Sequence, residues 1–295
     1  MFQQAPAAWV ACVFVLSLLV GSFLNVVIHR VPVMLEREWR AQAEQTLQPD
    51  RQGDPQPKYN LVEPRSACPK CGAKITALQN VPVISYLMLG GQCASCGTKI
   101  SVRYPLVELG TAILSALVAW KLGFVWYTAA ALVLTWTLVA LTGIDIDHQL
   151  LPDNMTLPLV WIGLLLSLAA PVPGLDLPVD PRSSIIGAVA GYLSLWSVYH
   201  VFRLLTGKEG MGYGDFKLFA ALGAWFGWQM LLPIILLAAF SGAVIGILMI
   251  VLRGRDRNIP IPFGPYLAAA GWIALMWGNE IVTSYLHFAG VSSVR

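Results

Sequence analysis

Acidic residues stand next to glycines in two separated stretches of the chain. GIDIDHQLLPD holds Asp145, Asp147 and Asp153, and GMGYGDFKLF holds Asp215, which lies 70 residues after Asp145. Two carboxyl groups brought close together cannot both ionise freely, so they share one proton. The charged group can accept a proton from water while the protonated group donates to a carbonyl oxygen, which is the chemistry of an aspartic protease. We predict that one acid from each stretch meets in such a pair.

Each acid also has an ordinary explanation. Asp153 precedes a long apolar run, as a helix N-cap does. Asp147 fits a solvated loop, and Asp215 with Lys217 fits a surface ion pair of little energetic value. These explanations do not account for the glycines before Asp215, which cost stability and which we expect to make room for an extended substrate backbone. Spacing alone does not choose between Asp145 and Asp147.

Four cysteines form a second candidate site. Cys68 and Cys71 lie in CPKCG, Cys93 and Cys96 lie in CASCG, and 21 residues separate the two pairs. Two sulfurs separated by two residues can face one point, and the glycine that follows lets the backbone turn beneath an ion. The two pairs therefore predict a tetrahedral site for one structural zinc. Two disulfides or two redox motifs are the alternatives, but the segment is expected on the reducing side of the membrane and no βαβ pattern surrounds it.

The elements that must position these residues are membrane helices. A chain with 57% hydrophobic and 12% charged residues and a mean hydropathy of +0.66 is not a water-soluble domain. We predict an α-helical polytopic membrane protein with about eight transmembrane helices, each able to cross about 30 Å of hydrocarbon. The predicted spans are residues 7–28, 105–122, 124–143, 154–170, 184–205, 217–231, 233–252 and 262–286. Tight hairpins are expected at Lys121-Leu122-Gly123 and at Pro233, and the prolines of residues 260–265 predict an irregular helix start that walls the active site.

The basic residues predict the orientation of the chain. Residues 29–104, 203–217 and 253–257 hold 10, 3 and 3 Lys and Arg, which is 16 of the 19 in the chain. By the positive-inside rule these segments are cytoplasmic and both termini lie outside. Asp145 and Asp215 then share the cytoplasmic face. The net charge of +3 reflects this sorting of loops and indicates no nucleic-acid partner.

One cytoplasmic segment, residues 29–104, is long enough to fold outside the membrane. Its first half is polar, and we expect a short amphipathic helix along the membrane surface followed by a flexible connector. Its second half carries the four cysteines. The sequence thus predicts a small cytoplasmic zinc-knuckle domain between the first and second transmembrane helices, stabilised by its metal ion.

The motifs together resemble a known family. GMGYGDFK contains the GxGD motif of membrane aspartyl proteases. With IDIDHQLLPD, the two cysteine knuckles, GSFLNVVIHR (residues 21–30), RYPLVELGTA (103–112) and PFGPYLAAAGW (262–272), the chain is similar to the bacterial type IV prepilin leader peptidase/N-methyltransferases. A lone GxGD is weak evidence, whereas this ordered set covers nearly the whole chain and is specific.

The resemblance implies roles for several residues. Asp145 and Asp215 are implied as the catalytic pair, because the family aspartate stands seven residues before the proline, here Pro152. The implied substrates are prepilins and type II secretion pseudopilins, cut at the cytoplasmic face of the bacterial inner membrane and then methylated at the new N-terminus from S-adenosylmethionine. Residues 1–104 would form the first transmembrane helix and the methyltransferase-associated four-cysteine zinc domain, and residues 105–295 the transmembrane aspartyl peptidase domain.

The residues themselves do not predict where the methyl donor binds. No G-x-G-x-x-G follows a predicted strand, and residues 29–104 are too few for a dinucleotide-type fold. Gly90-Gly91 and Glu108 are the positions worth testing, but a turn explains the first and an acid at the membrane boundary explains the second. The residues that bind S-adenosylmethionine are therefore unassigned.

Two other classes of protein also place acids or cysteines in a membrane protein. A proton-coupled transporter predicts acids near the bilayer midplane and inverted repeats, and the sequence displays neither. A zinc-dependent scaffold without catalysis predicts that Asp145 and Asp215 are replaceable. Asn substitution at the two acids therefore separates the enzyme from the scaffold.

Overall fold

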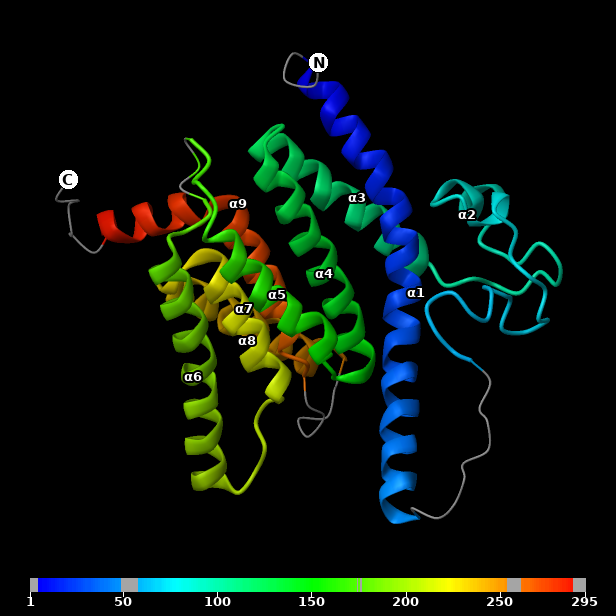
Figure 1. Cartoon of the computed structure of the whole chain (residues 1–295). Coiled ribbons are helices and arrows are strands. Elements are labelled where there is room, and N and C mark those ends of the chain that lie inside the picture. The colour runs from blue at the N-terminus through cyan, green and yellow to red at the C-terminus, as the bar shows by residue number, and fades with distance from the viewer. Residues whose placement is uncertain (1–4, 49–57, 174, 176, 254–260, 289–295) are drawn as a thin grey trace. The chain divides into compact units, whose positions relative to one another are not determined.

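The computed structural model describes residues 5–48, 58–173, 175, 177–253 and 261–288, and within them the regular structure is helical (Figure 1). The helices are α1 (Pro6–Leu47), η2 (Leu78–Asn80), α2 (Ile84–Met88), α3 (Arg103–Leu122), α4 (Trp126–His148), α5 (Asp153–Leu166), α6 (Pro181–Thr206), α7 (Tyr213–Phe226), η3 (Trp228–Met230), α8 (Leu231–Arg253) and α9 (Gly264–Phe288). Among the described residues, β-structure is limited to isolated bridges. The prediction of an all-helical fold is confirmed.

Five helices of the described chain are long and apolar enough to cross a membrane: α1, α3, α4, α6 and the continuous segment of η3 and α8. The protein is therefore a multi-pass membrane protein. Each of the eight predicted spans coincides with a helix, although α5 and α7 have only 14 residues each. The predicted helix break at Lys121-Leu122-Gly123 is confirmed, since α3 ends at Leu122 and α4 begins at Trp126.

The predicted break at Pro233 is wrong. The chain leaves α7 after Phe226, passes through η3 and begins α8 at Leu231. Gly227, with φ of +79°, makes the turn, and Pro233 lies in the first turn of α8. Proline is tolerated there because the amide nitrogens of a first helical turn have no intrahelical acceptor.

The expectation of a separate surface helix after the first span is also wrong. α1 is one continuous helix of 42 residues, and its polar part extends the span without a break. Strong helix formers dominate residues 34–47, so they propagate the existing helix instead of starting a new one. The expected connector falls on residues 49–57, which lie outside the described chain.

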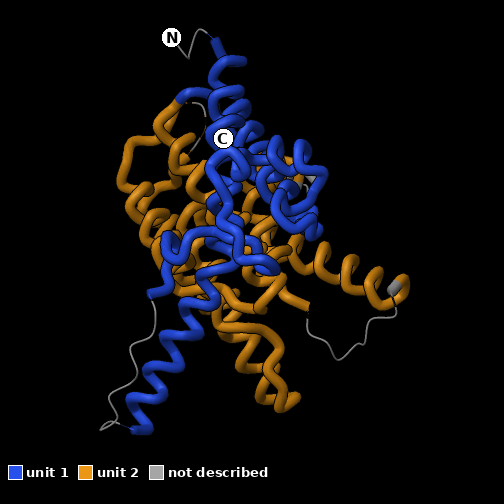
Figure 2. The backbone as a smooth tube through the Cα atoms, turned by 90° about the vertical axis from the view of Figure 1, so that its right-hand side faces the viewer, with its two compact units in different colours: residues 1–124 blue, residues 125–295 orange. Residues whose placement is uncertain are grey.

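The chain forms two compact units, Met1–Phe124 and Val125–Arg295 (Figure 2). In the first unit, α1 packs on α3 so closely that a Cβ at Gly21 would lie 2.7 Å from Glu108 Cα. Arg30, on α1, donates hydrogen bonds to the carbonyl oxygens of Asn60 (2.8 Å) and Pro64 (2.5 Å). These bonds tie the start of the cysteine-bearing segment to α1.

In the second unit, α7 lies at the centre and packs against α5, α6 and α9. Its side chains from Asp215 to Phe226 are buried, with the single exception of Lys217 in that run. Trp225 donates its Nε1 hydrogen to the Leu159 carbonyl of α5, and Ser184 of α6 donates to the Ala224 carbonyl. A helix enclosed in this way holds its first turn, and hence Asp215, in a fixed position.

Candidate active site and metal centre

The last turn of α4 presents Asp145. Successive residues of a helix are rotated by about 100°, so Asp145 and Asp147 point to opposite sides. Asp145 is buried, with 5% of its surface exposed, whereas Asp147 is exposed. Gly264, at the start of α9, donates its backbone hydrogen to Asp145 Oδ2 at 3.0 Å. The structure thus separates two acids that the spacing could not, and the predicted irregular start of α9 does border the site.

The first turn of α7 presents Asp215, which is also buried, with 6% exposed. Its Oδ2 accepts a hydrogen bond of 3.1 Å from the backbone of Gly212, the residue that caps the helix. Its Oδ1 is buried and has no hydrogen-bond partner in the described part of the chain. Asp215 and Asp145 border the same site, because Leu151 lies against both Gly214, the residue before Asp215, and Gly264, which contacts Asp145. The two stretches lie together as expected, but Asp145 and Asp215 lie within the ends of α4 and α7 and not between the predicted spans.

Leu151 joins the two halves of this site. A Cβ at Gly214 would lie 2.5 Å from Leu151 Cβ, and a Cβ at Gly264 would lie 3.1 Å from each methyl group of Leu151. The same Gly264 Cβ would lie 2.6 Å from Asp145 Oδ2. The room beside Gly214 is thus filled by Leu151 and not left for an extended substrate, which corrects our interpretation of that glycine. Leu151 packs α7 and α9 together beside the two acids.

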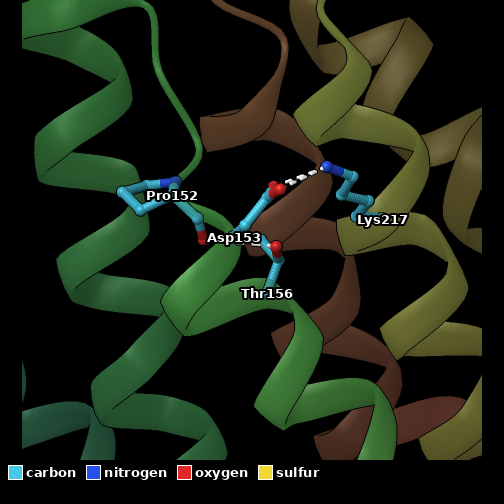
Figure 3. Close-up of polar contacts among 4 residues, drawn as sticks. All are labelled: Pro152, Asp153, Thr156 and Lys217. Atoms are coloured by element: carbon cyan, nitrogen blue, oxygen red, sulfur yellow. Dashed lines mark hydrogen bonds and ion pairs between the residues drawn. The ribbon is translucent and has the colours of Figure 1, made fainter. Parts of the chain in front are cut away.

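An ion pair holds the start of α5 to α7 (Figure 3). Lys217 Nζ lies 2.6 Å and 2.7 Å from the two carboxylate oxygens of Asp153. The alternative explanation of Asp215 as the ion-pair partner of Lys217 is not supported, because Lys217 pairs with Asp153 at the start of α5. The expectation that Asp153 is an N-cap is wrong too: Pro152 occupies that position, and Asp153 is the first residue of α5. An acid there still favours the helix by lying at the positive end of its dipole.

A small-residue motif on α6 also positions the site, and sequence reasoning missed it. Gly187 and Gly191 are four residues apart and face α7, where Gly187 meets Gly223 backbone to backbone. A Cβ at Gly191 would lie 2.8 Å from the Phe219 carbonyl oxygen. This is the small-xxx-small pattern that lets membrane helices approach closely. The GAVAG sequence was the signal that would have identified the contact.

The four cysteines meet in one cluster within the first unit. Their sulfur atoms all lie within 4.8 Å of one another, and all four are free thiols. The two knuckles have the same backbone geometry: Gly72 donates to the Cys68 carbonyl and Gly97 to the Cys93 carbonyl, each at 2.9 Å. Gly72 and Gly97 have φ of +70° and +67°, which a side chain would oppose. Disulfides are not formed in this structure, so the alternative of two bridges is not supported.

The dimensions and protonation of the cluster fit a zinc ion. Zinc–sulfur bonds of about 2.3 Å in a tetrahedron place sulfurs about 3.8 Å apart, and the Sγ atoms of Cys68 and Cys96 are 3.8 Å apart. Hydrogen bonds with Thr98 lower the pKa of Cys96 to about 6, so this ligand is a thiolate at neutral pH. The Ala73 amide lowers the pKa of Cys71, but the neighbouring sulfurs, Cys96 first, raise it to about 11. The close packing of the four sulfurs therefore keeps a proton on Cys71, and a bound cation would displace that proton.

Comparison with known proteins identifies the family of the chain. Residues 15–122 match the bacterial peptidase A24 N-terminal domain, and residues 132–247 match the type IV leader peptidase family. A prepilin leader peptidase/N-methyltransferase of Pseudomonas aeruginosa is 56% identical over 288 residues, covering 97% of this chain and 96% of the relative. The chain belongs to the type IV leader peptidase family. The resemblance predicted from the motifs is therefore confirmed.

Other leader peptidases agree along the same length. A protein of the same name from Aeromonas hydrophila is 57% identical, with 95% of each chain covered, and one from Neisseria gonorrhoeae is 52% identical, with 90% of each covered. No solved structure matches the chain. Both candidate sites fall in regions matched by leader peptidase family models: the cysteine cluster in the N-terminal one and the two acids in the other.

Proposed function

We propose that this protein cleaves the leader peptides of prepilins and pseudopilins and then methylates the new N-terminal residue. The observation that carries the peptidase half is the meeting of Asp145 and Asp215, two buried acids from different helices, each held at one oxygen by a backbone amide. The names of the relatives supply both halves of the activity.

Asp145 and Asp215 act as an acid–base pair on a water molecule. One carboxylate takes a proton from the attacking water while the other, protonated, donates to the oxygen of the scissile carbonyl. When the tetrahedral intermediate collapses, the C–N bond breaks and the leaving amine takes the proton that water gave up. The amides of Gly264 and Gly212 fix the rotamers of the two acids, and Asp215 Oδ1 is left without a partner among the described residues.

The position of the pair suits a substrate lodged in the bilayer. Asp145 lies three residues before the end of α4, a helix long enough to cross the membrane, so its carboxyl lies near a boundary and not at the midplane. A prepilin whose apolar segment is embedded in lipid presents its scissile bond at such a boundary. This placement favours a protease over a transporter, whose acids lie at mid-membrane. We assign this boundary to the cytoplasmic face of the bacterial inner membrane, with both termini periplasmic, from the distribution of basic residues.

The methyltransferase activity is assigned to residues 1–104, and the peptidase to residues 105–295. One zinc held by Cys68, Cys71, Cys93 and Cys96 would have four protein ligands and no open position, so it supplies folding stability and no reaction step. S-adenosylmethionine is the methyl donor expected for an N-methyltransferase. We assign no residues to its binding.

The test compares Asp145→Asn, Asp215→Asn and the control Asp147→Asn in the purified full chain in nanodiscs. With a prepilin as substrate, we expect the first two variants to lose cleavage and the control to keep it, because Asp147 faces away from the pair. Methylation of an already mature pilin should persist in all three, which reports correct folding. Cleavage by Asp145→Asn or Asp215→Asn at the rate of the unsubstituted protein would support the scaffold alternative and reject our assignment.

A further inference from the structure

The first unit contains an uncharged segment outside its long helices. Residues 75–98 include no Asp, Glu, Lys or Arg, whereas residues 29–74 carry charged side chains throughout. The short helix α2 lies within this segment. An exposed segment that avoids charge in a small, otherwise polar domain is unusual, because water-facing surfaces are normally rich in charged residues.

One face of α2 is apolar and uncovered. Ile84, Leu87 and Met88 follow the i, i+3, i+4 spacing of one helix face, and they are 56%, 71% and 81% exposed. Tyr86 points the other way, toward the second knuckle: it donates from its hydroxyl to the Ile100 carbonyl, and its own carbonyl accepts from Gly91. The orientation of α2 is therefore fixed by the domain, and its apolar face is presented outward.

A hydrogen bond fixes α2 to a membrane helix. The backbone of Val83, the residue before α2, donates to Glu108 of α3 at 2.8 Å. Val83 has φ of +59°, a conformation that a β-branched residue adopts only when its surroundings impose it. Glu108 itself is buried against Gly21 of α1. The start of α2 thus has a fixed height relative to two transmembrane helices.

The positions of Glu108 in α3 and of Gly21 in α1 both place the start of α2 within the bilayer. Glu108 is five residues into α3, which corresponds to about 7 Å along the helix from Arg103. Gly21 lies seven residues before the end of the predicted first span, which corresponds to about 10 Å. In Figure 1, α2 lies beside the part of α1 that α3 crosses, and not beside the distant charged end of α1. A depth of about 5–10 Å is where interfacial helices bury their apolar face.

We propose that the face formed by Ile84, Leu87 and Met88 inserts into the lipid bilayer. Helix α2 then attaches the segment that carries the four cysteines to the membrane surface. The occupant of this face is the boundary between lipid headgroups and acyl chains. Insertion removes three large apolar side chains from water, and the uncharged sequence around them requires no charge to be buried. The second knuckle, bonded to α2 through Tyr86 and Gly91, then has a defined height above the lipid.

The test measures lipid contact in the full chain in nanodiscs. A spin label is attached to p-acetylphenylalanine, which leaves the cysteines intact, at Met88, at Leu19 on the exposed face of the first span, or at Val62, an exposed apolar loop residue. Oxygen partitions into lipid and a nickel chelate stays in water. We expect the ratio of oxygen to nickel collisions at Met88 to approach that at Leu19 and to exceed that at Val62 several-fold.

Two outcomes would overturn the proposal. The first is a ratio at Met88 equal to that at Val62, which means that α2 faces water. The second is a low ratio in nanodiscs alone that rises only when a prepilin is added, which assigns this face to the apolar segment of the substrate.

The variant Glu108→Leu removes the hydrogen bond that fixes Val83, so we expect it to lower the ratio at Met88 and leave that at Leu19 unchanged. An unchanged ratio at Met88 in this variant would reject the depth argument.

Discussion

The backbone of Gly264 donates a hydrogen bond of 3.0 Å to Asp145, a residue 119 positions earlier in the chain. This bond sets the rotamer of one acid from the start of a different helix, α9. The close approach requires the absence of a side chain, because a Cβ at Gly264 would lie 2.6 Å from Asp145 Oδ2. A glycine in a proline-rich segment is therefore part of the proposed active site.

We predict that Gly264→Ala lowers kcat for prepilin cleavage by about 100-fold, since displacing a catalytic group by about 1 Å has an effect of that size. The measurement is single-turnover cleavage of a prepilin. Gly110→Ala is the matched control, because a Cβ there meets nothing within 4 Å. Equal rates for the two variants would show that the amide of Gly264 does not position Asp145.

The two glycines before Asp215 should respond differently to the same substitution. At Gly214 a Cβ would lie 2.5 Å from Leu151 Cβ, whereas at Gly212 the closest atom would be Asp215 Oδ2 at an ordinary 3.7 Å. Overpacking of this kind costs about 1–3 kcal/mol. We therefore expect Gly214→Ala to reduce cleavage or thermal stability strongly and Gly212→Ala to have a small effect. The reverse order, measured by cleavage rate and Tm, would contradict the packing role of Leu151.

Hydropathy predicted the helices because a backbone in lipid must satisfy its own hydrogen bonds. Each of the eight predicted spans falls on a helix of the described chain, but the limits of α7 and the start of α8 were misplaced, and both errors had local causes. Gly212 and Gly214 suggested a loop, yet Gly212 caps the helix and Gly214 lies inside it against Leu151. Pro233 suggested a break, but it lies in a first turn, where proline does not interrupt hydrogen bonds.

The two sites differ in how far the sequence determined them. The cysteine cluster was predictable because each knuckle is local, with its ligands and its glycine within five residues. The acids were recognisable as a pair, but their neighbours were not. Leu151 and Gly264 contribute through shape, and the partner of Lys217 depends on how α5 meets α7. A single sequence carries no signal for such long-range contacts.

The ion pair between Asp153 and Lys217 allows a double-mutant cycle. Asp153→Asn, Lys217→Gln and the double variant are compared for stability, with Lys208→Gln as the control for loss of a basic residue near α7. Asp153 is more than half exposed, so we expect a coupling energy of only about 0.2–1 kcal/mol. A larger effect on kcat than on stability would indicate that the pair also positions Asp215. Strict additivity would show that the contact contributes nothing.

The metal proposal predicts one zinc per chain, lost in Cys68→Ser and retained in Cys12→Ser, because Cys12 lies outside the cluster on α1. Thiolates bind zinc and thiols do not, so acid should release the ion. The pKa of Cys96 is lowered to about 6, which means that this ligand is charged above that pH and becomes protonated below it. Zinc content measured by mass spectrometry should therefore be full at neutral pH and fall as the pH is lowered and protons compete with the ion for the four sulfurs. The cluster lies in the part of the chain assigned to methyl transfer, so a chelator should reduce methylation more than cleavage. Full zinc content in Cys68→Ser would reject Cys68 as a zinc ligand.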